Sequence, residues 1–232
     1  MNTRRNSWKS YAFEFFSIFI AVISAFALSN WNDNRKDSQA ELKILTEIRN
    51  GLEKDKQDFT ENTVGHKTGI KSCKFWRKIL RQEAANLDSL QPYYFILTRD
   101  FITIQNSSGY ETLKSKGFEV IDNDSLRSEI ISLYEFDYQL IQKMEEEYHE
   151  GQFQENYFKS LNDAFAPNFE YDAKGNICNI ELPLKVPESE KKVLLSYLLK
   201  IQSNRKYLFS AYEDIIVKID KLQEAIEVEL KQ

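Results

Sequence analysis

Residues 11–28 read YAFEFFSIFIAVISAFAL, an almost unbroken apolar run that carries a single carboxylate, Glu14. A helix of this length covers about 27 Å, which is close to the thickness of the hydrocarbon core of a bilayer. The run therefore predicts a single transmembrane helix, to which we assign residues 11–30. The rest of the chain offers no second stretch of comparable length and apolarity.

The charge of the two flanks indicates the orientation of this helix. The residues before it include three bases and no acid, whereas the residues directly after it are of mixed charge. Because the more positive flank stays in the cytoplasm, we expect a single pass through the inner (cytoplasmic) membrane with the N-terminus inside. Residues 1–10 would then form a cytoplasmic tail and residues 31–232 an extracytoplasmic, periplasmic domain. The three bases are Arg4, Arg5 and Lys9.

A cleaved signal peptide is the alternative interpretation of the same run. Ala25-Phe26-Ala27 resembles a signal-peptidase site behind a basic and an apolar region, and Thr3-Arg4-Arg5 faintly resembles a twin-arginine signal. A carboxylate such as Glu14 is unusual in the apolar part of a signal peptide. Trp8 and Trp31 also bracket the run, as tryptophans do at the two interfaces of a membrane. These features favour a retained anchor.

One face of the predicted transmembrane helix is small and polar. Membrane helices associate through close backbone approach and interhelical hydrogen bonds, because lipid is as apolar as leucine. We therefore expect a homo-oligomer formed through this stripe, with the phenylalanines and isoleucines of the other faces toward membrane lipid. Steps of four and three residues trace the stripe through Ser10, Glu14, Ser17, Ala21, Ser24, Leu28 and Trp31.

Glu14 has three interpretations. A carboxylate inside a span costs about 2.5–3.5 kcal/mol when it is central, and less near an end. Glu14 lies a turn inside the cytoplasmic edge, so it could snorkel to the headgroups or bond Ser10 or Ser17 of its own helix. It could instead make a buried contact between helices. The third interpretation is a site that handles ions or protons in an oligomeric pore.

The composition of the remaining chain predicts one helical domain. Only seven glycines and four prolines in 232 residues favour long helices with few turns, and 42% hydrophobic residues suffice for a core. The formal net charge of −5 includes three positive charges in the first ten residues, so the remainder is strongly acidic and we expect no nucleic-acid partner. The predicted fold class is all-α: an elongated antiparallel helical bundle that continues the transmembrane helix, with one small β-hairpin at about 168–181.

Two long helices are predicted from apolar periodicity. No residue between Trp31 and Asp37 breaks a helix, so we expect the anchor to continue into the first one as a rigid stalk. The apolar positions of the first helix are Leu42, Leu45, Ile48, Leu52, Phe59, Ile70, Cys73, Trp76, Ile79 and Leu80. The last helix has the clearest heptad, with Arg205 as its single interruption: Leu194, Leu198, Ile201, Arg205, Leu208, Tyr212, Ile215, Ile219, Leu222 and Ile226.

Shorter elements are expected between these two helices. Gln91-Pro92 is predicted to end the first unit, and an aromatic helix is predicted at 93–105. Ser108 with Glu111 three residues later predicts a capping box, and Gly117 is a natural C-terminal residue for that helix.

Asn123 is predicted to cap the next helix, and two extended stretches around the turn-rich residues 172–176 predict the hairpin. The expected buried face of the helix after Asn123 consists of Leu126, Ile130, Leu133, Leu140 and Met144.

Few residues carry recognisable chemistry. Cys73 and Cys178 could form a disulfide in a periplasmic domain or remain two thiols. His149 forms one Glu-x-x-His pair with Glu146, whereas a di-iron bundle needs two, so we expect a solvated charged helix face instead. Gly65 to Gly69 looks like a loop but lacks the spacing of a phosphate loop. The sequence thus predicts no catalytic residue, no metal and no other cofactor, and a protein that is not an enzyme.

Two stretches together resemble a known family. They are similar to single-span membrane proteins of Bacteroidota that are catalogued only as a domain of unknown function. That family often has glycine where this chain has Phe13 and Ala21. The resemblance implies a location and a topology, and it suggests that Glu14 has a role, but it brings no activity. The matching positions are Glu14, residues 30–36, Tyr110-x-x-Leu113-Lys114-x-x-Gly117, Ile121 and residues 123–127.

Three functional hypotheses follow. The leading one is a non-enzymatic, membrane-anchored helical scaffold or accessory subunit that self-associates through its transmembrane helix and supports an envelope complex, with another envelope membrane protein as a partner. The second is a periplasmic sensor that binds a small ligand between aromatic-rich helices, and the third is an ion-coupled or channel-like oligomer that uses Glu14. The aromatic residues of the second hypothesis are Tyr93, Tyr94, Phe95, Phe101 and Tyr110.

Overall fold

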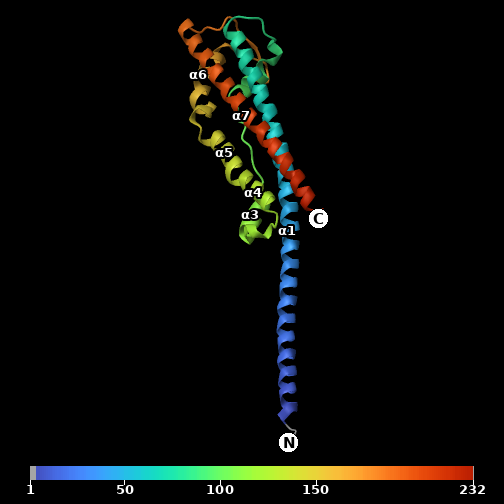
Figure 1. Ribbon diagram of the computed structural model, residues 1–232. Coiled ribbons are helices and arrows are strands. Elements are labelled where there is room, and N and C mark those ends of the chain that lie inside the picture. Colours follow the sequence, from blue (N-terminus) through green and yellow to red (C-terminus); the bar gives the residue numbers. More distant parts are fainter. Residues whose placement is uncertain (1–3, 232) are drawn as a thin grey trace.

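One helix forms the long axis of the molecule. The computed structural model describes residues 4–231, and in it helix α1 runs without a break over 77 residues, Arg4–Leu80 (Figure 1). At 1.5 Å per residue this helix is about 115 Å long. The predicted anchor and the first helix of the domain are therefore one continuous rod, which confirms the expected stalk. The loop predicted at Gly65 to Gly69 is wrong, because both glycines lie inside α1.

Some sequence-based assignments fall outside the described part. Residues 1–3 of the predicted cytoplasmic tail, with Thr3 of the twin-arginine-like stretch, are not described, nor is Gln232. The backbone of α1 is described from Arg4 onward, but the side chains of Arg4, Arg5, Lys9 and Ser10 are not.

A second long helix packs against the upper part of α1. Helix α7, Glu188–Glu229, has 42 residues and runs antiparallel to α1 (Figure 1). Two ion pairs show the antiparallel direction. Lys56 of α1 pairs with Asp220 of α7, whereas Lys67, which comes later in α1, pairs with Glu213, which comes earlier in α7. All ten heptad positions predicted in this helix are buried, including Arg205.

A broken third layer lies beside the pair α1 and α7. It contains helices α4 (Asp124–Ser132), α5 (Tyr138–Gln142) and α6 (Lys159–Phe165). π-Helical turns interrupt it at η3 (Leu133–Asp137), η4 (Lys143–Glu147) and η6 (Gln154–Phe158), and a 3₁₀ turn lies at η5 (His149–Gly151). Each π turn accommodates an extra residue and so rotates the helix face that follows it. Tyr138 and Ile141 are therefore buried, whereas the predicted core residue Leu140 is 46% exposed.

The shorter helices differ in part from their predictions. Helix α2 covers Leu90–Leu97, so Pro92 lies inside it and the helix ends well before residue 105. Helix α3 covers Ser108–Lys116 and ends at Gly117 as predicted. The predicted capping box is wrong, because Ser107 occupies the N-cap and makes no side-chain cap bond. The remaining 3₁₀ turns are η1 (Leu87–Ser89), η2 (Phe118–Val120) and η7 (Ala166–Asn168).

The predicted cap and hairpin are confirmed. The Asn123 side chain accepts a hydrogen bond from the Leu126 backbone N–H at the start of α4. Strands β1 (Phe169–Tyr171) and β2 (Ile177–Ile180) pair antiparallel, with a register irregularity next to Tyr171. The turn between the strands contains Gly175 at φ 84°, a left-handed conformation that glycine adopts easily.

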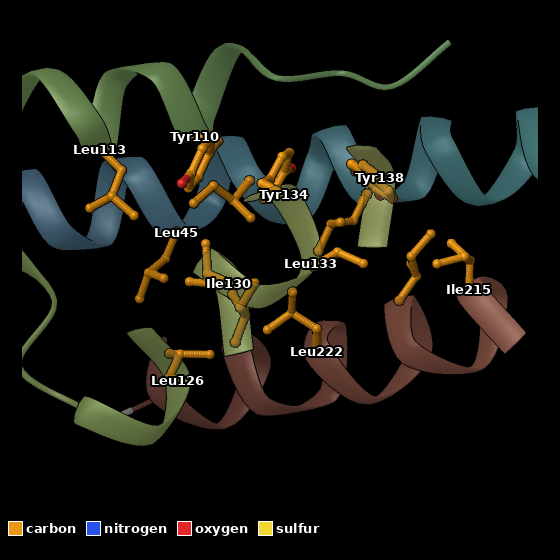
Figure 2. Close-up of a cluster of buried hydrophobic side chains, with 14 of the residues drawn as sticks. Leu45, Tyr110, Leu113, Leu126, Ile130, Leu133, Tyr134, Tyr138, Ile215 and Leu222 are labelled. Carbon is orange, nitrogen blue, oxygen red and sulfur yellow. The ribbon is translucent and has the colours of Figure 1, made fainter. Parts of the chain in front are cut away.

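The bundle has two separate hydrophobic cores. The lower core lies near the exposed part of α1 and is built by α1, α3, α4, η3, α5 and α7 (Figure 2). In it, the rings of Tyr110 and Tyr134 stack with centroids 4.4 Å apart. The upper core lies at the other end of the bundle and is built by α1, α2, η6, α6, the hairpin and α7. There, the Trp76 and Phe165 rings stack at 4.1 Å.

The lower core begins at Ile44 on α1. The other apolar positions predicted in this helix from Leu45 to Leu80 are buried, but Leu42 is 47% exposed, whereas its neighbour Glu41 is half-buried and accepts a hydrogen bond from the Asp122 N–H.

Candidate functional site

The apolar part of α1 stands free of the bundle. Its large apolar side chains from Trp8 to Trp31 are all exposed, and none of the apolar window is buried against the rest of the protein. Among the described residues this is the one helix that is long and apolar enough to cross a membrane. The chain thus has one N-terminal helix that could span a bilayer.

The structure places the stripe residues on the free part of α1. Glu14, Ser17, Ala21 and Ser24 are all helical and exposed, so none of them is used by the bundle. The Ser17 hydroxyl donates to the Phe13 carbonyl oxygen at 2.8 Å. Ser17 therefore uses its proton within its own helix and does not donate to Glu14.

The cysteines are not joined. Cys73 is buried in the upper core and Cys178 is exposed on β2, and both are free. Burial raises the pKa of the Cys73 thiol to about 11, so this group is protonated and inert at neutral pH. The disulfide considered from the sequence is thus absent, because the two side chains lie in different environments.

The acidic segment around His149 is not one solvated helix face. Among the described residues, no group of three or more His, Cys, Asp or Glu side chains is placed to hold a metal ion. His149 and Glu146 are exposed, and they lie in a 3₁₀ turn and a π turn rather than in one helix. Glu145 instead turns inward, where its carboxylate accepts hydrogen bonds from the Thr103 hydroxyl at 2.8 Å and the Tyr212 hydroxyl at 2.5 Å.

The aromatic residues of the sensor hypothesis do not form one pocket. Tyr93 and Tyr94 pack against the upper core, Tyr110 belongs to the lower core, and Phe101 lies between the two. Phe95 is 60% exposed. The five residues therefore do not line a common pocket, and the sensor hypothesis stays a prediction that would need another site.

Sequence reasoning missed a buried polar layer between the two cores. Arg205 is fully buried there, and its Nη2 donates to the carbonyl oxygens of Ile96, Leu97 and Arg99, where α2 ends. The guanidinium also lies over the ring of Phe153 at 4.7 Å. Burial lowers the pKa of Arg205 to about 10, so the group stays charged at neutral pH. We define the polar layer as His66, Phe101, Thr103, Glu145, Arg205 and Tyr212.

Two glycines of α1 make room for this layer. A Cβ at Gly65 would lie 2.3 Å from Phe101 Cε1, and a Cβ at Gly69 would lie 2.6 Å from Arg205 Nε. Glycine at both positions thus lets the Phe101 ring and the guanidinium approach the α1 backbone. The pair of glycines, together with an arginine at a heptad position, was the signal in the sequence that could have indicated this contact.

Residues 98–107, which we call the strap, cross the polar layer without regular secondary structure (Figure 1). Side chains of the neighbouring helices bond the strap backbone. Asp58 accepts from the Ile104 N–H at 2.9 Å, Asp55 accepts from the Asn106 N–H at 2.6 Å, and the Tyr212 hydroxyl lies 3.3 Å from the Phe101 carbonyl oxygen. Two side-chain carboxylates and a tyrosine hydroxyl thus replace the backbone partners that a helix or sheet would supply.

Two titratable groups at or near the polar layer have strongly shifted pKa values. Burial raises the pKa of Asp55 to about 6, although hydrogen bonds from the Asn106 N–H and the Tyr138 hydroxyl favour its charged form. Burial, helped by the charge of Arg205, lowers the pKa of His66 to about 3. At neutral pH His66 is therefore neutral. Both shifts make the stability of the fold depend on pH.

Comparison of the chain with protein-family models, curated proteins and solved structures gives no match. The resemblance to Bacteroidota single-span proteins therefore stays a prediction.

Proposed function

We propose that this chain is a non-enzymatic, membrane-anchored helical scaffold or accessory subunit. Its N-terminal helix anchors it in the inner membrane and self-associates through the stripe, and its bundle supports an envelope complex on the periplasmic side. The observation that carries the proposal is the free apolar part of α1, which no other described element covers and which continues rigidly into the bundle.

The exposed faces of α1 support an association of two copies. Continuing the steps of the stripe beyond Trp31 leads through Arg35 and Ser38 to Leu42, an apolar side chain that is left outside the lower core. The next step of the same pattern is Leu45, which is fully buried in the lower core, so the stripe is open to a second copy only up to Leu42. A second copy would therefore pack along the stripe below this level, because Ser38 already lies beside Val120 and Asp122 of its own bundle.

Matched alanine variants test the self-association. Ala21 lies on the stripe, whereas Ala12 lies on nearly the opposite side of the same helix. We expect Ala21→Leu to weaken association of the full chain in mild detergent at least tenfold, because the larger side chain prevents close backbone approach. Ala12→Leu should leave the oligomer unchanged. Analytical ultracentrifugation measures both, and a wild-type chain that is strictly monomeric without partners would overturn the scaffold proposal.

Glu14→Gln separates the remaining roles of this residue. Loss of the oligomer would favour a buried contact between helices. An intact oligomer that has lost an ion-dependent activity would favour the ion-coupled alternative. No effect on either would leave Glu14 as a snorkelling residue with no special role.

The proposed orientation has its own test. Cys178 is exposed and Cys73 is buried, so native chains offer one accessible thiol. A membrane-impermeant maleimide should label Cys178 in intact spheroplasts, and Cys178→Ser should abolish the label. Labelling that requires lysis would place the bundle in the cytoplasm and overturn the orientation.

A further inference from the structure

The polar layer coincides with the weakest part of the architecture. The lower core reaches Phe59, Ile141 and Tyr212, and the upper core begins again at Cys73, Phe153 and Ile201, so no apolar cluster bridges the two. Of the chain segments that pass this level, only α1 and α7 are regular helices. The others are the strap and the run of π and 3₁₀ turns over residues 143–158.

The strap is attached at this level by hydrogen bonds and by one half-buried ring, Phe101, which packs against His66 and Arg205. Tyr212, Glu145 and Asp58 hold its backbone and its Thr103 side chain by hydrogen bonds. Water can replace a hydrogen bond when a segment detaches, whereas it cannot replace the burial of apolar surface. Detachment of the strap thus loses the burial of the Phe101 ring but of no other large apolar side chain, since Ile102 and Ile104 are exposed. A segment that is held by a core would lose more.

Several buried polar atoms in and beside the layer have no partner in the protein. They are Arg205 Nε and Nη1, His66 Nδ1 and Thr63 Oγ1. Buried donors and acceptors of this kind are satisfied by water when no protein group bonds them. This level of the bundle is therefore the one that water has a physical reason to enter.

We propose that the strap and residues 143–152 form one opening unit, which detaches from α1 and α7 while both cores stay folded, since Phe153 and Tyr157 belong to the upper core and stay in place. In the closed state the Glu145 carboxylate joins the two halves of the unit, because it belongs to η4 and bonds Thr103 of the strap. Opening exposes the Arg205 guanidinium and the neighbouring aromatic rings to solvent. The bundle thus contains a conformational device between its membrane-proximal and distal halves.

Hydrogen exchange of the full chain in detergent micelles tests this unit directly. The reporting amides are those whose hydrogen bonds hold the unit closed or lie within it. The Ile104 N–H bonds Asp58 of α1 and the Thr103 N–H bonds Glu145, whereas the Tyr148 and Gln152 N–H groups bond within residues 143–152. We expect them to exchange at least 100-fold faster than the amides of α1 at 44–59 and of α7 at 215–226. Equal protection of the unit and the two long helices would overturn the proposal, because the layer would then open only with global unfolding.

A pair of tyrosine variants tests the role of the polar attachments. Tyr212→Phe keeps the ring but removes the hydroxyl that bonds Glu145. Tyr110→Phe is the matched control, because its hydroxyl bonds Glu135 in the lower part of the bundle. We expect Tyr212→Phe to speed exchange of the unit about tenfold and leave the lower core unchanged, and Tyr110→Phe to leave the unit unchanged. Equal acceleration of all regions in Tyr212→Phe would overturn the proposal.

Discussion

At the scale of single residues, Arg205 organises the centre of the bundle. Its position in the heptad of α7 would ordinarily hold an apolar side chain, yet it is fully buried. A buried charge is tolerated where hydrogen bonds and aromatic faces replace water, and here three carbonyl oxygens and the ring of Phe153 do so. Arg205 therefore bonds the carbonyl groups at the C-terminal end of α2, although it lies more than 100 residues later in the chain.

Asp55 and His66 act on stability in opposite directions as pH changes. The raised pKa of Asp55, about 6 against an ordinary 3.8, means that its contribution is fully present below pH 3.8 and is lost as pH rises through 6. The lowered pKa of His66, about 3 against 6.5, means that its contribution is present above pH 6.5 and is lost as pH falls toward 3. Between pH 4 and 6 the two effects partly cancel.

Asp55→Asn should reveal this cancellation. The variant removes the loss of stability that Asp55 causes as pH rises, while it keeps a side chain of similar shape. From pH 4 to pH 7, we expect the free energy of unfolding of the variant to gain about 2–3 kcal/mol relative to wild type. Urea unfolding of the full chain in detergent at several pH values measures the difference. A difference that does not change with pH would contradict the raised pKa of Asp55.

Gly65→Ala should destabilise the bundle although alanine favours helices. The gain in helix propensity is about 1 kcal/mol, but the new Cβ would lie within 2.8 Å of three ring atoms of Phe101. We expect a net loss of about 1–3 kcal/mol in the free energy of unfolding. Gly151→Ala is the control, because its nearest atom would lie 3.7 Å away. Thermal or urea unfolding that shows equal stability of Gly65→Ala and wild type would contradict the close approach of Phe101.

At the scale of elements, regular helices were predictable and irregular ones were not. The heptad of α7 identified every buried position except Gln202, because a regular helix of 42 residues keeps one period throughout. In the third layer the π turn η3 shifts that period, so Leu140 turns outward and Ile141 inward. The strap was predicted as part of a helix, since its partners are side chains of Asp55, Asp58 and Glu145 that no local pattern connects to it.

We expect alanine substitutions at the N-caps of α3 and α4 to differ in their effect on stability. Asn123 bonds the Leu126 N–H at the start of α4, so Asn123→Ala should cost about 1 kcal/mol in the free energy of unfolding. Ser107 occupies the N-cap of α3 without a cap bond, so Ser107→Ala should change stability by less than about 0.5 kcal/mol. Chemical unfolding monitored by circular dichroism compares the two. Equal losses would show that the cap geometry does not determine the effect.

At the scale of the whole molecule, the sequence predicted the elongated shape but not its division into two cores. The absence of helix breakers between Trp31 and Asp37 was enough to predict one rod. The polar layer depends on Arg205, Gly69 and a strap that come together only in three dimensions. The association surface at Glu14, Ser17, Ala21 and Ser24 stays a prediction, because it concerns contacts between chains.

The continuity of α1 makes a prediction about distances. Asn34 and Lys78 are both exposed and lie 44 residues apart on one helix, so spin labels at these positions should be separated by about 66 Å. Double electron–electron resonance on a Cys178→Ser background should give one narrow distribution near this value. A broad distribution at shorter distances would indicate a bend between the apolar part of α1 and the bundle.

Because α1 is a single helix, the number of residues between its apolar part and the bundle also fixes the rotation of the bundle around the helix axis. Each residue inserted between Lys36 and Glu41 would raise the bundle by about 1.5 Å and turn it by about 100° around the helix axis. Two inserted residues would rotate the bundle by about 200°, so that it would face nearly the opposite direction relative to the stripe. Seven inserted residues would bring it back to within about 20° of its original orientation. If the bundles of an oligomer are to keep facing the same partner, the length of the stalk can therefore change only by about seven residues at a time.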